Sequence, residues 1–267
     1  MYPFLFKSYI PTFSLFIWIA LIVCVCLYNN VWFHWSCCPN RFLKNSSVIF
    51  IGAFIGGKVL SFISKPEAYF PNGKYHIYSI LSLGFVYYGG MIGALIAIII
   101  LCRGNRKEIL SMTDTVFRLI PIGQTIGRMG CFFSGCCYGM AYEGLFAIRY
   151  PVDGEMIKVF PTWFVEALGC LVLGIILLFN RDKQRGTYTF EYFVFYGLLR
   201  FFIEFVRGDA VRGMLSGLST SQWISLLFVL IGIVGIIHIC YTNIIKKLED
   251  GGRVGYEQFG GKIIKSK

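Results

Sequence analysis

The clearest pattern in this sequence is a series of long apolar runs separated by shorter polar and basic stretches. Runs of about 17 to 25 residues with few charges are long enough to cross a bilayer as helices. The pattern therefore predicts an all-α integral membrane protein with seven transmembrane helices. The predicted spans are residues 12–29, 47–64, 82–102, 113–139, 160–180, 187–207 and 221–241.

The fourth span is the least regular. Pro121 and five glycines between Gly123 and Gly139 interrupt it, so we expect a broken or kinked helix. At Gly130, Gly135 and Gly139 we expect positive φ or a close backbone approach to a ligand. Elsewhere glycines four residues apart predict close helix packing, as they do at the start of the fourth span. These pairs are Gly52 with Gly56, Gly89 with Gly93, and Gly123 with Gly127.

Composition and charge agree with a membrane protein. Hydrophobic residues make up 56% of the chain and charged residues only 15%, whereas soluble domains carry about a quarter charged. Fourteen lysines and arginines fall on one side of the predicted spans and six on the other. By the positive-inside rule the amino terminus lies outside and the carboxyl terminus in the cytoplasm. The net charge of +11 then faces anionic lipid, and we predict no nucleic-acid partner.

This topology divides the chain into a transmembrane domain, residues 1–245, and a basic cytoplasmic tail, residues 246–267. The predicted location is the bacterial cytoplasmic membrane, with multiple passes. Two longer outer loops, residues 65–81 and 140–159, are predicted either to cap an outward-facing site or to serve as plain connectors.

Ionisable residues inside the spans are costly and indicate functional sites. Those in the outer half of the predicted spans are Lys58, Arg128, Glu166, Arg200 and Glu204. Tyr196, Arg200, Glu204 and Arg207 are spaced by four, four and three residues, which places them on one helix face. Cations exceed carboxylates in this group, which predicts a polar cavity that binds an anion. In the outer leaflet that anion is a phospholipid phosphate.

Some of these charges have a structural interpretation as well. Arg200 and Glu204 could simply neutralise each other within one helix. Glu191 and the pair of Asp114 and Arg118 lie nearer the inner face, and we interpret them as structural.

Five ordered motifs resemble the prolipoprotein diacylglyceryl transferase family, a seven-helix membrane fold with an outward-facing site. The motifs are YYGGMIG at 87–93, GRMGCFFSGCCYG at 127–139, FPTWFVEA at 160–167, YGLLRFFIEFVR at 196–207 and LSTSQWIS at 218–225. The resemblance implies transfer of the diacylglyceryl group of phosphatidylglycerol, or a related anionic phospholipid, to the lipobox cysteine thiol of a prolipoprotein. Arg128 and Arg200 would bind the phosphate and stabilise the leaving group.

The catalytic residues predicted on this basis are Arg128, Arg200, Tyr88, Glu204 and Tyr196. The predicted substrate-binding residues are Gly89, Gly90, Gly127, Gly130, Cys131, Cys136, Gly139, Lys58, Glu166 and Arg207. We expect no cofactor and no metal ion.

The chain departs from the family pattern at the groups that handle protons. Tyr88 stands where the family usually has histidine, and a tyrosine hydroxyl is a poor base at neutral pH. Cys131 and Cys136 replace an asparagine and a glutamate, and Phe13 resembles the position of a first-helix tyrosine. None of His34, His76 and His238 lies where the missing histidine should be.

The three cysteines Cys131, Cys136 and Cys137 allow several interpretations: small-residue packing, a thiol in the chemistry, or a redox or metal site. There is no CxxC pair or nearby histidine to favour zinc. The alternative functions are a divergent relative with another acceptor, a non-enzymatic protein that binds or transports anionic lipid, and a membrane thiol oxidoreductase.

Overall fold

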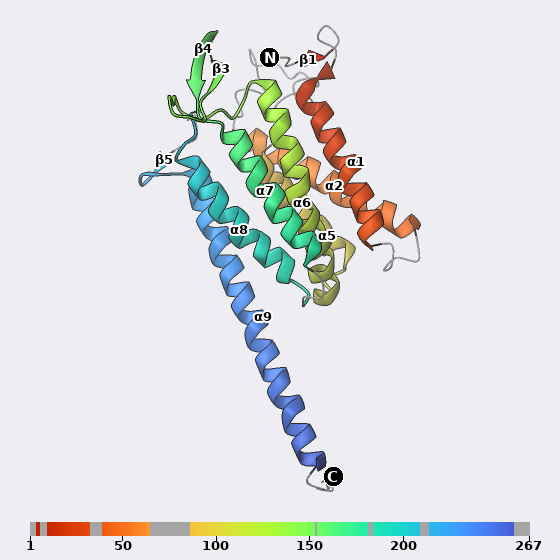
Figure 1. Ribbon diagram of the computed structural model, residues 1–267. Helices are drawn as coiled ribbons and strands as arrows, with labels where there is room; N and C mark the ends of the chain where they lie inside the picture. Colours follow the sequence, from red (N-terminus) through yellow and green to blue (C-terminus); the bar gives the residue numbers. More distant parts are fainter. Residues whose placement is uncertain are drawn as a thin grey trace. The chain divides into compact units, whose positions relative to one another are not determined.

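The structure is a computed structural model that describes residues 4–5, 10–32, 39–64, 86–152, 154–180, 184–208 and 214–258. The chain forms two compact units, one of Val23–Val116 and one of Met1–Ile22 together with Phe117–Lys267. Helices dominate both units, as the hydropathy pattern predicts (Figure 1). The predicted loop at 65–81, His34 and His76 lie outside the described residues.

The unit Val23–Val116 is built on the pairing of helices α2 (Pro39–Ser64) and α5 (Tyr87–Leu101). Their glycines face each other across the helix contact. A Cβ added to Gly52 would lie 2.7 Å from the Cβ of Ala97, and one added to Gly56 would collide with the Gly89 carbonyl oxygen. Close packing predicted from two of the four-residue glycine spacings is thereby confirmed.

The second unit holds the remaining helices and most of the polar contacts. Its helices are the first part of α1 (Thr12–Trp32), most of α6 (Arg106–Ser134), and all of α7 (Thr162–Phe179), α8 (Thr187–Glu204) and α9 (Thr220–Gln258). Helix α8 packs against both α7 and α9 (Figure 1). Tyr192 and Phe193 of α8 pack against Phe117 of α6, with ring centroids 5.0 Å apart in both pairs.

Helix α6 is continuous through Pro121, so a break at this proline is wrong, whereas the alternative prediction of a kink stays a prediction. The helix ends at Ser134, short of the predicted end of the span at residue 139. The departure from helical geometry comes directly after it. Gly135 has φ +81° and Cys137 has φ +61°, both in the left-handed region.

In the described part of the chain, three two-stranded antiparallel hairpins accompany the helices, and the sequence analysis did not predict them. They are β1 (Phe4–Leu5) with β2 (Ile10–Pro11), β3 (Ile148–Val152) with β4 (Glu155–Val159), and β5 (Met214–Leu215) with β6 (Leu218–Ser219). The second hairpin folds the predicted loop 140–159 into ordered structure. Strands this short carry too weak an alternation to be read from sequence.

Residues 138–142 lie between two partners and tie helix ends together. On one side Gly139 N donates to Phe160 O at 3.2 Å and Tyr142 N donates to Lys158 O at 3.0 Å. On the other side Met140 N donates to Val206 O at 2.9 Å. The carboxyl ends of α6 and α8 and the amino end of α7 are therefore held side by side, which positions the candidate site.

The helices suit a membrane. Among the described residues, three segments are long and apolar enough to cross a bilayer: Lys44–Ile63, Thr162–Phe179 and Thr220–Lys246. Shorter apolar helices cover Thr12–Leu27 and Tyr87–Leu101. Their outward side chains are large and apolar, for example Ile63, Ile100 and Phe179 at 66%, 68% and 80% exposure. Lipid is the environment that covers such surfaces without cost.

Two element ends differ from the predicted spans. Helix α8 ends at Glu204, so Arg207 lies beyond it, in an isolated bridge with Gly139. Helix α9 continues through the predicted tail boundary at Lys246 as far as Gln258. Residues 259–267 of the tail lie outside the described residues.

Candidate anion-binding site at the ends of helices α6, α7 and α8

The centre of the site is the buried carboxylate of Glu166 on α7. Its Oε1 lies 2.6 Å from Nη2 of Arg128, which comes from α6. Its Oε2 lies 3.5 Å from Nη1 of Arg200, which comes from α8. Two guanidinium groups from different helices therefore meet at one carboxylate. The sequence analysis predicted that these charged residues lie close together.

Glu204 extends this network at the end of α8. Its Oε2 lies 2.7 Å from Nη2 of Arg200 and 4.0 Å from Nε of Arg207. The i, i+4 pair of Arg200 and Glu204 is thus real, but it is not self-contained, because both partners make a second charged contact. The purely local interpretation of this pair is therefore incomplete.

The five charged groups carry an excess of positive charge, since three arginines face two glutamates. Four of the side chains are at most 8% exposed, and only Arg128 is more accessible, at 18%. Buried charges of this kind are costly unless they are paired. Arg128 is consequently the arginine that an incoming anion can reach first.

Tyr196 and the start of α9 complete the polar network. Tyr196 OH donates to Glu166 Oε1 at 3.4 Å, so the predicted face of α8 does point into the site. Ser219 Oγ donates to Glu204 Oε1 at 3.0 Å. Sequence analysis did not single out Ser219, although it lies in the motif at 218–225.

The signal that could have found Ser219 is a capping box at the start of α9. Ser219 Oγ accepts from Gln222 N at 3.2 Å, and Gln222 Oε1 accepts from Ser219 N at 2.8 Å. This reciprocal pattern follows from serine and glutamine three residues apart. It holds the Ser219 hydroxyl next to Glu204.

Sequence analysis also missed two residues that support the charged network, Gln124 and Tyr192. Gln124 Oε1 on α6 accepts from Tyr192 OH at 3.2 Å, and Tyr192 stacks on Tyr196 with ring centroids 5.3 Å apart. These contacts restrict the rings of α8 that approach Glu166. A half-buried glutamine between two helices has no distinctive spacing, so the sequence carries no specific signal for Gln124.

The remaining predicted site residues fall in two places. Tyr88, Gly89, Gly90 and Lys58 belong to the unit Val23–Val116. There Gly89 packs against Gly56 and Leu60 of α2, and Lys58 Nζ lies 5.8 Å from the ring centroid of Phe54. Helix packing accounts for Gly89, and a substrate contact by any of the four stays a prediction.

The predicted glycines of the second unit serve close approaches. A Cβ on Gly130 would lie 2.8 Å from the Cβ of Phe16 on α1. A Cβ on Gly139 would collide with the carbonyl oxygen of Phe160. Gly127 has only Ile17 nearby, at 3.9 Å, so its packing does not demand glycine. The positive φ expected among these glycines is confirmed at Gly135, whereas Gly130 and Gly139 approach other parts of the chain, and a close approach to a ligand stays a prediction.

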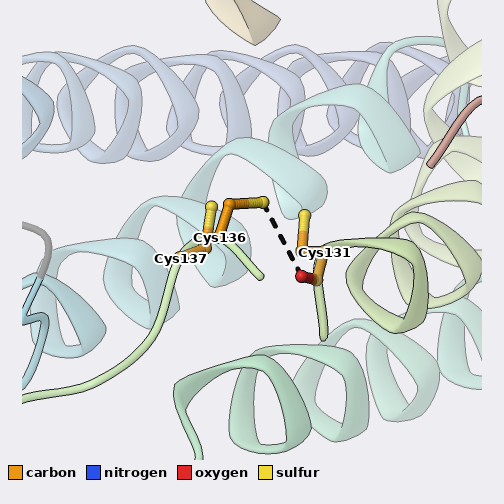
Figure 2. A group of neighbouring side chains, drawn as sticks. All are labelled: Cys131, Cys136 and Cys137. Atoms are coloured by element: carbon orange, nitrogen blue, oxygen red, sulfur yellow. Dashed lines mark hydrogen bonds between the residues drawn. The ribbon is translucent and has the colours of Figure 1, made fainter. Parts of the chain in front are cut away.

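The cysteine turn, which we define as Cys131, Cys136 and Cys137, lies next to the charged network. Its three sulfur atoms lie within 4.8 Å of one another (Figure 2). Cys136 Sγ approaches Cys131 O at 3.7 Å, the contact dashed in Figure 2. Cys131 is buried, Cys137 is half-buried and Cys136 is exposed. Cys137 also interacts electrostatically with Arg128 and Arg207.

Two side chains at the amino end of α7 donate hydrogen bonds to the backbone of the cysteine turn. Trp163 Nε1 donates to Cys136 O at 2.7 Å, and Thr162 Oγ1 donates to Cys137 O at 2.8 Å. Cys131 and Trp163 share a small core with Tyr150 of β3, which donates from its hydroxyl to Phe132 O at 3.0 Å. Burial raises the pKa of Tyr150 above its ordinary value, so the hydroxyl remains a donor.

Arg118 has the structural role that the sequence analysis assigned to it. Its Nε donates to Leu177 O at 2.9 Å and its Nη2 to Leu178 O at 3.0 Å, at the carboxyl end of α7. Its guanidinium carbon also lies 4.3 Å from the ring centroid of Tyr188. A cation that binds the last carbonyls of a helix stabilises that helix end.

A surface hollow of about 650 Å³ lies elsewhere, over the second hairpin. Its lining comprises Ala141, Tyr142, Glu143, Arg149, Met156, Ile157 and Lys158. It contains none of the predicted site residues and no part of the buried charge network. The arginine network is therefore the stronger candidate site, because its charges converge from three helices.

Fold and site together define a helical membrane protein with a buried, positively charged network suited to an anion. A sequence model of the family described as prolipoprotein diacylglyceryl transferase matches residues 3–238. The chain belongs to this family.

Named relatives agree with the family model. The chain is 36% identical over 188 residues to the phosphatidylglycerol–prolipoprotein diacylglyceryl transferase of Clostridium tetani, covering 68% of this chain and 74% of the relative. It is 33% identical over 196 residues to phosphatidylglycerol–prolipoprotein diacylglyceryl transferase 2 of Clostridium perfringens, covering 71% and 75%. A transferase of the same name from Idiomarina loihiensis is 33% identical over 191 residues, covering 69% and 71%.

Proposed function

We propose that this protein transfers the diacylglyceryl group of phosphatidylglycerol, or of a related anionic phospholipid, to the lipobox cysteine thiol of a prolipoprotein. The observation that carries the proposal is the convergence of Arg128 and Arg200 on Glu166 from different helices. Membership of the family supports the same reaction.

The geometry leaves hydrogen-bond donors for a phosphate. Arg128 contacts Glu166 through Nη2, and Arg200 contacts its two glutamates through Nη1 and Nη2. A guanidinium has five N–H donors, so these carboxylates orient both arginines without using every donor. The excess positive charge of the network then attracts an anion.

The reaction needs a thiolate nucleophile and a stabilised leaving group. The acceptor sulfur forms a C–S bond with the glyceryl carbon while the C–O bond to phosphate breaks, and the released glycerol phosphate keeps the electron pair. Arg128 and Arg200 offset the negative charge that grows on the leaving oxygen. Tyr196, Glu204 and Arg207 hold the arginines in position rather than touch the reacting atoms.

We place the protein in the bacterial cytoplasmic membrane with seven spans and its site facing outward. The described helices overlap all seven predicted spans, and lysines and arginines concentrate on the side assigned to the cytoplasm. On the family resemblance we also propose substrate contacts at Gly127, Gly130, Cys131, Cys136 and Gly139 of one unit and, separately, at Lys58, Tyr88, Gly89 and Gly90 of the other.

The decisive experiment pairs genetic complementation with a direct assay. A strain without its own diacylglyceryl transferase should grow when it expresses this chain. Purified protein should transfer label from phosphatidylglycerol to a lipobox peptide and release glycerol phosphate. A protein that binds the lipid but neither rescues growth nor transfers label would refute the enzymatic proposal and favour a lipid-binding role.

The two arginines can be tested by conservative substitution. Arg128→Lys and Arg200→Lys keep the charge but lose the two-pronged hydrogen bonding, so each should reduce kcat about 100-fold or more. Arg149→Lys, at an exposed hairpin position, is the matched control and should keep wild-type activity. Full activity in either site variant, with the thermal stability unchanged, would remove that arginine from the phosphate clamp.

A further inference from the structure

We propose that the cysteine turn is a binding site for a thiophilic metal ion such as Zn²⁺, with one coordination position left for a thiolate. The sequence spacing did not favour such a site, because it contains no CxxC pair. The fold nevertheless brings three sulfur atoms within 4.8 Å of one another (Figure 2).

The sulfur positions are close to those of a metal–thiolate site. Zinc binds thiolate sulfur at about 2.3 Å in a tetrahedron, which sets sulfur atoms about 3.8 Å apart. Because all three lie within 4.8 Å, small side-chain rotations would complete the geometry. A disulfide would use only two of the three sulfurs and would not explain why the third converges with them.

The backbone of the turn is held for this arrangement. Gly135 and Cys137 both have positive φ, and such strain at a non-glycine residue is concentrated at functional sites. Trp163 and Thr162 fix the carbonyl groups of Cys136 and Cys137 from the neighbouring helix. Fixed outer contacts of this kind orient metal ligands and strengthen binding.

Two guanidinium groups lie near the cysteine turn. Arg128 and Arg207 interact electrostatically with Cys137, and Arg128 does so with Cys131 as well. Three thiolates with Zn²⁺ carry one net negative charge, and a fourth thiolate adds another. The nearby guanidinium groups offset the negative charge of this metal–thiolate complex. Because the same groups repel a metal ion that is not neutralised, all three thiolates are needed to bind it.

The open position suits the acceptor thiol of the proposed transfer, and this step rests on the proposed function. An unperturbed cysteine thiol is mostly protonated at neutral pH, and a metal-bound thiol is deprotonated. The acceptor S–H proton would leave to solvent as its sulfur binds the metal. The sulfur would then form the C–S bond as the phosphate departs, and the thioether product, a weak ligand, would dissociate.

Metal binding can be measured without any transfer assay. Reduced, metal-free, full-length protein in detergent is titrated with Co²⁺, whose tetrahedral thiolate complexes give charge-transfer and visible absorption bands. We expect one Co²⁺ per chain and loss of these bands in Cys131→Ser, Cys136→Ser and Cys137→Ser. Cys240→Ser, which alters an exposed cysteine of α9, should bind like wild type. Cys136 is exposed, so its variant is expected to fold, and an unchanged melting temperature checks this.

A positioning variant adds a second readout. Trp163→Phe keeps the ring but removes the donor to Cys136 O, and it should weaken Co²⁺ binding about 10-fold. A cysteine-containing lipobox peptide should shift the Co²⁺ spectrum, and its serine counterpart should not. Absence of Co²⁺ binding by the reduced protein, or binding that survives replacement of all three cysteines, would overturn the metal site.

Transfer activity separates this proposal from the previous one. Chelator treatment should abolish label transfer, and Zn²⁺ should restore it. Transfer that resists chelation would overturn the metal's part in thiol activation and leave the proposed function intact. A protein that binds Co²⁺ but transfers nothing with any metal would refute the proposed function and leave the metal site standing.

Discussion

Glu166 is the residue on which the geometry of the site depends. It accepts from Arg128, Arg200 and Tyr196, which come from two other helices, and its side chain is only 3% exposed. A carboxylate that neutralises two arginines at once allows Arg200 to stay buried and Arg128 to stay mostly covered. Each arginine is then held in place before any anion arrives, which is the arrangement that stabilises a developing charge most effectively.

Replacing Glu166 by glutamine tests this role. The amide keeps the size but not the charge, so the buried guanidinium group of Arg200 and the mostly covered one of Arg128 lose their shared counter-ion. We expect a loss of about 3 to 5 kcal/mol in the free energy of unfolding, seen as a lower melting temperature in detergent. Glu143→Gln, at an exposed position, is the control and should melt like wild type. An unchanged melting temperature in Glu166→Gln would show that the network contributes little to folding.

At the scale of elements, the hairpins and caps decide how the helix ends meet. Residues 138–142 bond to residues 158–160 on one side and to residues 206–208 on the other, so three helix ends cannot separate. The capping box at Ser219 and Gln222 starts α9 and places a hydroxyl on Glu204. Short connecting segments and a helix cap therefore determine how the charged side chains at the helix ends are positioned.

Helix packing in the other unit can be tested at Gly93. A Cβ at this position would collide with the Gly52 carbonyl oxygen, and the obstacle is backbone that cannot rotate away. Gly93→Val should therefore separate α2 from α5 and lower the free energy of unfolding by about 1 to 3 kcal/mol. Ile92→Val changes the neighbouring outward position, which is 52% exposed, and should be nearly neutral in a thermal melt. Equal melting temperatures for the two variants would contradict the close-packing account.

At the scale of the whole molecule, apolar surface and basic charge are distributed as a membrane requires. The exposed faces of α2, α7 and α9 carry large apolar side chains, whereas the charged network lies among protein atoms. Polar groups at membrane depth are tolerated only in such protected places. The charge asymmetry of the loops then predicts the orientation of the chain.

The orientation predicts where reporters fused to the chain will be active. A reporter after Lys247 should read cytoplasmic, because the basic end of α9 resists translocation. Reporters near Gly73 and within the hairpin turn at Gly154 should read external. Paired alkaline phosphatase and fluorescent-protein fusions at each position report on which side of the membrane that position lies. Two fusions at opposite ends of one predicted span should give opposite results and serve as the internal control. An external carboxyl terminus would overturn the orientation and the outward-facing site.

Sequence alone was sufficient where the physics is local. Long apolar runs predict membrane helices because each charged residue placed in hydrocarbon is costly by itself. Glycines four residues apart predict close contact because they fall on the same helix face, one turn apart. The face of α8 that carries Tyr196 and Arg200 followed from helical periodicity in the same way. The site residues of this face can therefore be named from their spacing in the chain.

Tertiary structure alone decided which of these residues meet. Glu166 lies far along the chain from both Arg128 and Arg200, and no local pattern reveals that one carboxylate serves two arginines. Helix α6 continues through Pro121, which the presence of a proline did not predict. The convergence of Cys131 with Cys136 and Cys137 depends on two positive φ angles and on hydrogen bonds from α7. Such arrangements are set by long-range packing, which a linear pattern does not encode.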